Sequence, residues 1–100
     1  MSPRQALGAA RRLVANYETW TQKCRARDKG GSSCPALAPF AVRWCAEGAV
    51  VKVTNALEVG DIAIDMLEAA AQRLFGYSIT QVNDSPGGRE KALQCFDAAT

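Results

Sequence analysis

The stretch FAVRWCAEGAV, residues 40–50, places a thiol beside a cation and near a carboxylate: Cys45 follows Arg43 and Trp44, and Glu47 comes two residues later. A cysteine nucleophile needs an exposed, electropositive setting and a partner base. The 100-residue chain has no histidine, which excludes Cys-His and Ser-His-Asp arrangements within it. We therefore interpret the stretch as a buried helix with Trp44 and Cys45 facing the core. Arg43 and Glu47 then form an exposed i,i+4 pair.

Two further groups contain residue types that bind metals. Asp61, Asp65 and Glu68 lie at helical spacing, and such carboxylates bind magnesium or run acid/base chemistry, although three on one helix face are usually a solvated surface. The four cysteines are Cys24, Cys34, Cys45 and Cys95. Because they are widely spaced and include no C-x-x-C pair, we expect reduced thiols packed as small hydrophobic residues. We predict no catalytic residue, no metal site and no cofactor.

The segment 23–29 carries positive charges at every second position, and with Trp20 it forms the predicted partner-binding site. These residues are Trp20, Lys23, Arg25, Arg27 and Lys29. A period of two suits a short extended arm with its basic side chains on one face. The Asp28-Lys29-Gly30-Gly31 sequence favours a turn, which makes the arm a hairpin or an ordered excursion. The alternative is a solvated loop whose charges protect an exposed edge from aggregation.

Four helices are expected to position these residues. Their apolar residues recur at three- and four-residue steps, and Ser2-Pro3, Pro39, Asp61 and Gly76 supply start or stop signals. The expected ranges are residues 4–24, 39–53, 61–75 and 88–99. A capping box over Ser78–Gln81 predicts one more helical turn, and the turn-rich residues 83–88 lead into the last helix.

Composition and charge bound the fold class. The chain is 48% apolar and 22% charged, contains no run long enough to cross a bilayer and begins without a secretory h-region, so we expect a cytoplasmic protein. Residues 1–54 hold nine Lys or Arg against three Asp or Glu, and residues 55–100 hold three against seven. The halves either neutralise each other on folding or one meets an acidic partner. We predict a single domain, 1–100, that is mostly α. It is a compact bundle of about four helices, all-α or with a minor β-hairpin in the arm between the first two.

Two segments carry a resemblance. The first runs from Trp20 through Arg27-Asp28 to Gly31 and continues into AVRWCAEGAV, and the second is SITQVNDSPGGREKALQCFDAA. Together they resemble a family of small uncharacterised bacterial and phage-borne proteins that have an RWC…GA helix and an ND-x-PG turn before the last helix. The matching positions are Arg27, Asp28, Arg43, Trp44, Cys45, Asn83, Asp84, Pro86 and Gly87. The resemblance implies a cytosolic domain whose ND-x-PG turn fixes the last helix against the RWC helix, and it brings no activity.

These features favour a small non-enzymatic protein-binding module that docks on a host protein or nucleoprotein complex. A phage-derived inhibitor of a host defence complex, such as an anti-CRISPR protein, is one form of it. The alternative is a nucleic-acid-binding accessory protein that uses the basic arm 23–29, with Trp20 or Tyr17 stacking on bases. A net charge of +2 is low for that role. An enzyme built on the acidic strip is the third hypothesis. A homodimer stays open, and no membrane partner is expected.

Overall fold

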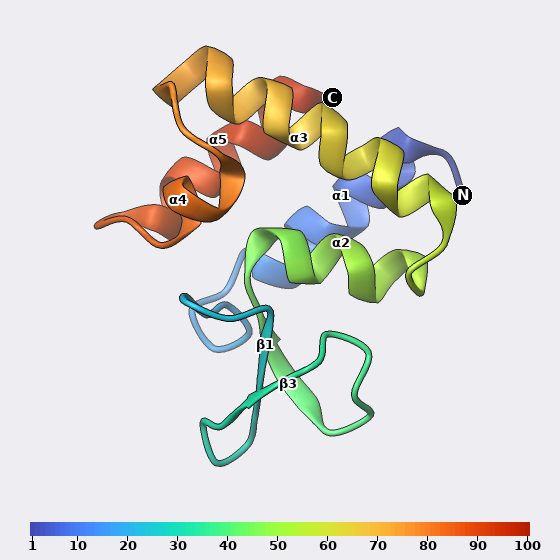
Figure 1. Cartoon of the computed structure of the whole chain (residues 1–100), viewed down its shortest axis with the longest axis vertical. Helices are drawn as coiled ribbons and strands as arrows, with labels where there is room; N and C mark the ends of the chain where they lie inside the picture. Colours follow the sequence, from blue (N-terminus) through green and yellow to red (C-terminus); the bar gives the residue numbers. More distant parts are fainter.

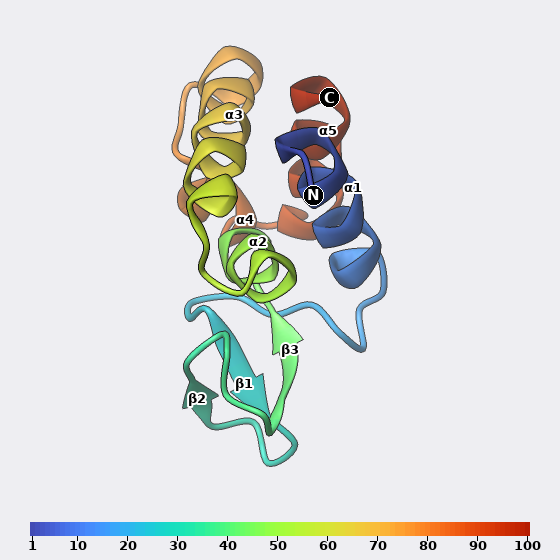
Figure 2. The same cartoon turned by 90° about the vertical axis from the view of Figure 1, so that its right-hand side faces the viewer.

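The chain forms five helices and a three-stranded antiparallel sheet with strand order β2-β1-β3, as seen in a computed structural model that describes residues 1–100. The helices are α1 (Pro3–Val14), α2 (Ala46–Thr54), α3 (Glu58–Phe75), α4 (Ile79–Asn83) and α5 (Gly88–Ala99). The strands are β1 (Ala26–Asp28), β2 (Ser33–Cys34) and β3 (Ala41–Trp44). The helices form one body, in which α1 packs on α2, α3 and α5. The sheet and its loops, residues 26–44, project from the α2 end of this body (Figures 1 and 2), and we call them the sheet lobe.

The fold class is therefore α+β, and the prediction of a mostly α bundle of about four helices was wrong. The hairpin in the arm between the first two helices is present, because β1 pairs antiparallel with β2 in the register Ala26↔Cys34. The missed element is β3, which pairs antiparallel with β1 on its other side, with an irregular register between Arg27 and Asp28. A short apolar run such as AVRW gives the same signal for a strand as for a buried helix.

Helix α1 is shorter than expected, and the prediction that it continues to residue 24 was wrong. Its start agrees with the sequence, since Ser2 and Gln5 form a capping box and Pro3 occupies the first turn. After Val14 the chain turns, and the Thr19 hydroxyl donates to the carbonyl of Leu13 at 2.6 Å. Residues 19–21 then pair with β3 instead of continuing the helix: Thr21 N–H donates to Trp44 C=O at 3.0 Å, and Trp44 N–H donates to Thr19 C=O at 2.9 Å.

The C-terminal half follows the sequence pattern closely. Helix α3 begins at Glu58, three residues earlier than expected, so that Asp61 is an acidic residue of its first turn, and it ends at Gly76 in the left-handed conformation (φ 73°). The capping box of Ser78 with Gln81 opens α4. Helix α5 covers residues 88–99 as predicted.

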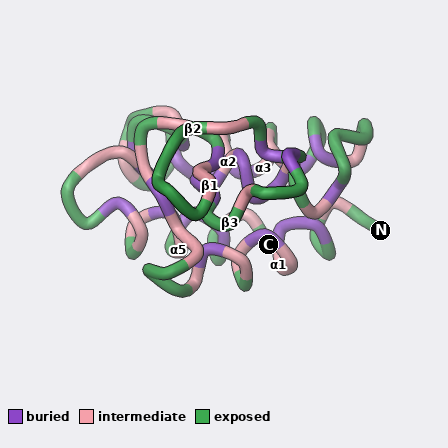
Figure 3. The backbone as a smooth tube through the Cα atoms, turned by 90° about the horizontal axis from the view of Figure 1, so that it is seen from below, coloured by how far each residue is buried: buried purple, intermediate pink, exposed green.

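A single apolar core lies between the helices and reaches the base of the sheet lobe. Its largest buried side chains include Leu7 of α1, Val50 of α2, Leu67 of α3 and Phe96 of α5, and Trp44 continues it into β3. Figure 3 views the molecule from the sheet end and shows exposed backbone along the loops of the lobe. None of the five helices combines the length and the apolar character needed to span a bilayer.

The positive and negative halves of the sequence meet at few ion pairs. Of the three ion pairs in the structure, one joins the two halves: Arg11 of α1 contacts Asp97 of α5 at 2.7 Å. The other two lie within one half each, between Arg25 and Glu47 and between Arg89 and Glu90. Most of the basic excess in residues 1–54 is therefore left without a paired carboxylate.

Candidate functional site

The residues around Cys45 that could support nucleophilic chemistry do not form a cluster in the folded protein. Cys45 lies between β3 and α2, where its Sγ accepts the Gly48 N–H at 3.2 Å and caps the helix. Trp44 and Cys45 are both buried, as expected. The predicted Arg43–Glu47 pair is wrong, because Arg43 belongs to the strand and Glu47 binds Arg25 at 2.8 Å instead. Burial raises the pKa of the Cys45 thiol, so the thiol stays protonated at neutral pH and serves as a structural cap.

The ND-x-PG turn supplies the centre of a buried hydrogen-bond network. The Asn83 side-chain oxygen accepts the Trp20 indole N–H at 2.9 Å and the Ala46 backbone N–H at 3.0 Å. Its amide nitrogen donates to the Thr21 carbonyl at 3.0 Å and to Asp84 at 3.1 Å. One side chain on α4 therefore joins the 19–22 segment to the start of α2. Because Asn83 is almost completely buried, water cannot replace these bonds.

Neighbouring residues extend the network toward α5. Gln22 donates from its side-chain amide to the carbonyls of Asn83 and Ser85, both at 3.0 Å. The backbone N–H of Lys23 donates to the Asp84 carboxylate at 2.8 Å. A Cβ on Gly88 would lie 2.0 Å from the Asn83 carbonyl oxygen, so α5 packs on this turn through a bare backbone. The arrangement is architectural and joins the turn before α5 to the start of α2. The expected RWC helix on the other side is wrong, because Arg43 and Trp44 end β3 and Cys45 caps α2.

The predicted partner-binding residues do not form one basic row. Arg27 is held by the protein itself, since its guanidinium donates to the Thr21 hydroxyl and to the carbonyls of Gly31 and Gln22. Arg25 is paired with Glu47, and Lys29 is exposed at the tip of the hairpin. Lys23 has a positive φ of 71° and makes no side-chain hydrogen bond or ion pair. The period-two pattern was misleading because strand β1 begins only at Ala26.

A hollow beside Trp20 nevertheless brings three of the five together, and we call it the groove. It has a volume of about 360 Å³, and its lining residues are Tyr17, Trp20, Thr21, Gln22, Lys23, Arg27 and Arg43. Three of the lining residues are cations, two are aromatic and none is acidic. Sequence reasoning missed Arg43 here because it placed that residue on a helix. The groove combines positive charge with aromatic surface, which suits an anionic ligand.

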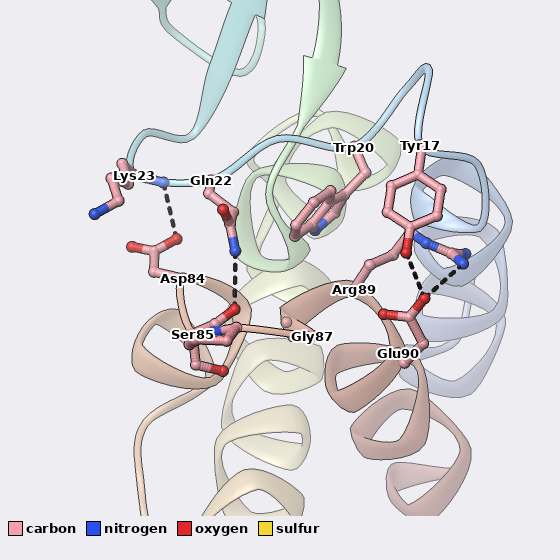
Figure 4. A pocket seen from close by; sticks show the side chains of 11 residues that line it. Tyr17, Trp20, Gln22, Lys23, Asp84, Ser85, Gly87, Arg89 and Glu90 are labelled. Carbon is pink, nitrogen blue, oxygen red and sulfur yellow. Dashed lines mark hydrogen bonds and ion pairs between the residues drawn. The ribbon is translucent and has the colours of Figure 1, made fainter.

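A second hollow of about 500 Å³ adjoins the groove and shares Tyr17, Trp20, Gln22 and Lys23 with it. Figure 4 shows it between the 17–23 segment and the first turn of α5. Its far end is closed by side chains bound to each other: the Tyr17 hydroxyl donates to Glu90 at 2.6 Å, and the Arg89 guanidinium lies 4.1 Å from the Tyr17 ring centroid. Arg89 also donates to the Ala15 carbonyl and to Glu90. These bonds tie α5 to the end of α1.

The Tyr17 hydroxyl is the main reason why the pKa of Glu90 lies below its usual range, and Arg89 adds to the effect. We expect Tyr17→Phe to raise the pKa of Glu90 toward an ordinary value of about 4.3. A carboxylate with a lowered pKa stabilises the fold above its ordinary pKa, and this contribution is lost as the pH falls through the lowered value. The stability difference between wild type and Tyr17→Phe should thus be largest near neutral pH and shrink in acid. NMR titration of the Glu90 carboxyl and urea unfolding at several pH values measure both effects.

A second surface of interest lies on the sheet lobe, where three large apolar side chains are exposed within six residues. Leu37, Phe40 and Val42 are 39%, 59% and 41% exposed. They lie in the β2–β3 loop and on β3, and we call them the lobe patch. Sequence reasoning missed this patch, because it assigned Phe40 and Val42 to the apolar surface of a helix. No local signal marks the patch, because a short apolar run such as AVRW fits a strand and a buried helix equally well.

The residues considered for metal chemistry are not gathered into a site. No group of three or more Cys, Asp or Glu side chains is placed where it could hold a metal ion. Glu68 accepts the Ile79 N–H at 3.1 Å and so helps to start α4, while Asp61 and Asp65 lie exposed on α3. All four cysteines are free thiols, with Cys45 and Cys95 buried and Cys24 and Cys34 partly buried.

Comparison with curated proteins and with solved structures gave no match. Comparison with family models gave one match, which covers the helical body and the sheet lobe together. Its model is described as a family of unknown function (DUF6197) and matches residues 1–100, so the chain belongs to this uncharacterised family.

Proposed function

We propose that the chain is a cytoplasmic, non-enzymatic protein-binding module that docks on its partner through the lobe patch. The observation that carries the proposal is the exposure of Leu37, Phe40 and Val42 together on a lobe that projects from the helical body (Figure 2). Isolated exposed apolar residues are common, but a local group of them on a projecting element is typical of an interaction surface. Aromatic residues and arginine are enriched in such interfaces.

Charge around the lobe favours a partner with an acidic surface. Lys29 and Arg43 are exposed on the lobe, and neither side chain makes a hydrogen bond or an ion pair. Asp28, the only acidic residue within the lobe, is partly buried and accepts the Ser32 N–H. Cations on the same lobe as an apolar docking surface attract an acidic partner and raise the association rate.

We further propose that the partner is a host protein or nucleoprotein complex and that the chain is of bacterial or phage origin. In the narrowest form of this proposal it is a phage-derived inhibitor of a host defence complex, such as an anti-CRISPR protein. Its support is that a side chain of catalytic type, Cys45, serves the fold as a buried helix cap. An inhibitor acts by occupying a surface and needs no catalytic group.

The expected result of changing Phe40→Ser together with Val42→Ser is loss of the partner with little loss of stability. Both side chains are largely in water already, so the free energy of unfolding should change by less than about 1 kcal/mol. The measurement is parallel affinity capture of tagged wild type and variant from a bacterial lysate treated with nuclease, read by mass spectrometry. A stoichiometric protein should be recovered with wild type and be absent or strongly depleted with the variant.

Leu57→Ser with Ile62→Ser is the matched control, because these residues are also exposed and apolar but lie at the start of α3, away from the lobe. The control should retain the partner. Retention of the same partner by the Phe40/Val42 variant would contradict docking through the lobe patch. Capture that disappears for wild type on nuclease treatment would instead favour the alternative function, nucleic-acid binding.

A further inference from the structure

We propose that the groove beside Trp20 binds a nucleotide, a ligand that joins a planar aromatic ring to a phosphate. The planar ring lies against Tyr17 and Trp20, and the phosphate is held by Lys23 and Arg43. This site is distinct from the lobe patch, and the inference does not rest on docking of a protein partner.

The charges of the groove favour an anion. Lys23 and Arg43 are exposed and make no side-chain hydrogen bond or ion pair, and no acidic residue lines the groove. Arg27, the third cation, is fixed by three hydrogen bonds to neutral oxygen atoms, so its positive charge is not compensated by a carboxylate. An arginine fork and a lysine point charge together suit a phosphate, whose oxygen atoms accept several charge-assisted hydrogen bonds.

The aromatic side of the groove favours a planar ring. Tyr17 is largely exposed, and its ring meets Trp20 edge-on, with 6.0 Å between centroids and an interplanar angle of 82°. Arg89 covers one face of the Tyr17 ring and lines the second hollow but not the groove. Tyr17 therefore lines the groove with a largely exposed side chain. Nucleobases stack on such rings whatever their sequence, because every base has a π-face.

The groove is held in shape before any ligand arrives. The indole N–H of Trp20 is bound to the buried Asn83, and the backbone of Lys23, at its left-handed φ, is bound to Asp84. Arg27 connects the groove wall to the hairpin through Gly31. Binding then orders few additional groups, which lowers its entropic cost. A volume of about 360 Å³ is in the range of small-molecule sites and fits one nucleotide.

The same chemistry can come from a free nucleotide or from one unit of a single-stranded nucleic acid. The test is a ¹⁵N NMR titration of the full chain with four probes: adenosine 5′-monophosphate, adenosine, inorganic phosphate and a short single-stranded oligonucleotide. The monophosphate should shift the Trp20 indole N–H and bind more tightly than adenosine or phosphate alone. The Trp44 indole N–H, buried and bound to the Ala36 carbonyl, should stay unchanged and serves as an internal control. Tighter binding of the oligonucleotide than of the monophosphate assigns the site to a strand, and the reverse assigns it to a free nucleotide.

Charge reversal separates the groove from non-specific attraction. Lys23→Glu with Arg43→Glu should weaken binding of the monophosphate at least about tenfold, since hydrogen bonds to charged groups are lost. Arg4→Glu with Arg12→Glu changes the net charge equally at exposed, unpaired positions of α1 and should leave the affinity within roughly twofold. Tyr17→Phe should keep the affinity, because the ring is retained, while Tyr17→Ala should reduce it several-fold.

Three results would overturn the inference: no shift of the Trp20 indole with either the monophosphate or the oligonucleotide, equal affinity for phosphate alone, or the same loss in the Arg4/Arg12 control as in the groove variant. Each of these leaves the lobe patch and its capture experiment unaffected. The Phe40/Val42 variant keeps Lys23 and Arg43 and so tests the lobe patch without changing the groove, whereas the groove variant also removes one of the two lobe cations.

Discussion

Asn83→Ala is expected to destabilise the protein by about 3–5 kcal/mol, a large part of the 5–15 kcal/mol typical of a small domain. The substitution leaves the Trp20 indole N–H, the Ala46 N–H and the Thr21 carbonyl without their partner. Each buried polar group that loses its hydrogen bond costs about 1–3 kcal/mol. Urea unfolding followed by circular dichroism measures the change, and the melting temperature should fall by roughly 15 °C or more.

Asn16→Ala is the matched control for this prediction. Asn16 is exposed and its side chain makes no hydrogen bond, so removal of the same amide should change the stability by less than about 0.5 kcal/mol. A loss below about 1 kcal/mol for Asn83→Ala would mean that the network does not hold α4 against α2 and the 19–22 segment.

Gly48→Ala is the second change with a large expected effect. A Cβ at this position of α2 would lie 2.1 Å from the Arg25 carbonyl oxygen and 2.9 Å from its carbonyl carbon. The obstacle is backbone, and the same oxygen accepts the Cys45 N–H at 3.1 Å, so α2 and the segment before β1 must separate. We expect a loss at or above the upper end of the 1–3 kcal/mol usual for overpacking, despite the better helix propensity of alanine.

Gly8→Ala tests the same substitution where space is available. Gly8 lies within α1, and a Cβ there would be 3.8 Å from the end of the flexible Arg12 side chain. Alanine should therefore stabilise the helix by about 0.5–1 kcal/mol. If denaturant unfolding showed that Gly48→Ala stabilises the protein as Gly8→Ala does, the close approach of α2 to Arg25 would be refuted.

The sequence predicted the parts of the fold that depend on local signals. The cap at Ser2, the capping box at Ser78, the stop at Gly76 and the last helix all depend on neighbouring residues, and the structure has them. The turn at Asn83 was recognised as well. The hydrogen bonds of the Asn83 side chain to other segments were not, because its main partners lie about forty to sixty residues away in the chain.

The errors share one physical cause, which is pairing between distant segments. Residues 19–21 continue the apolar period of α1, yet they pair with Trp44. By its own residues the AVRW segment fits a helix, and it forms a strand because it pairs with β1. A three-residue strand leaves no local pattern that distinguishes it from a loop, and tertiary pairing then overrides propensity.

The candidate sites were likewise predicted where local residues sufficed and missed where distant segments meet. Trp20, Lys23 and Arg27 were selected from the sequence and do line one groove, but Arg43 joined them only through the β1–β3 pairing. Arg25 was selected for its charge, but Glu47 of α2 neutralises that charge. The sequence had placed the start of this helix too early. The lobe patch could not be separated from core residues, because an apolar side chain carries no sign of whether a strand exposes it.

Hydrogen–deuterium exchange of the full wild-type chain, alone and with its captured partner, tests most directly where the protein makes contact. Docking through the lobe patch predicts slower exchange in residues 35–43 and unchanged exchange along α3 and α5. Protection confined to α3 or α5, with residues 35–43 exchanging as in the free chain, would contradict the account.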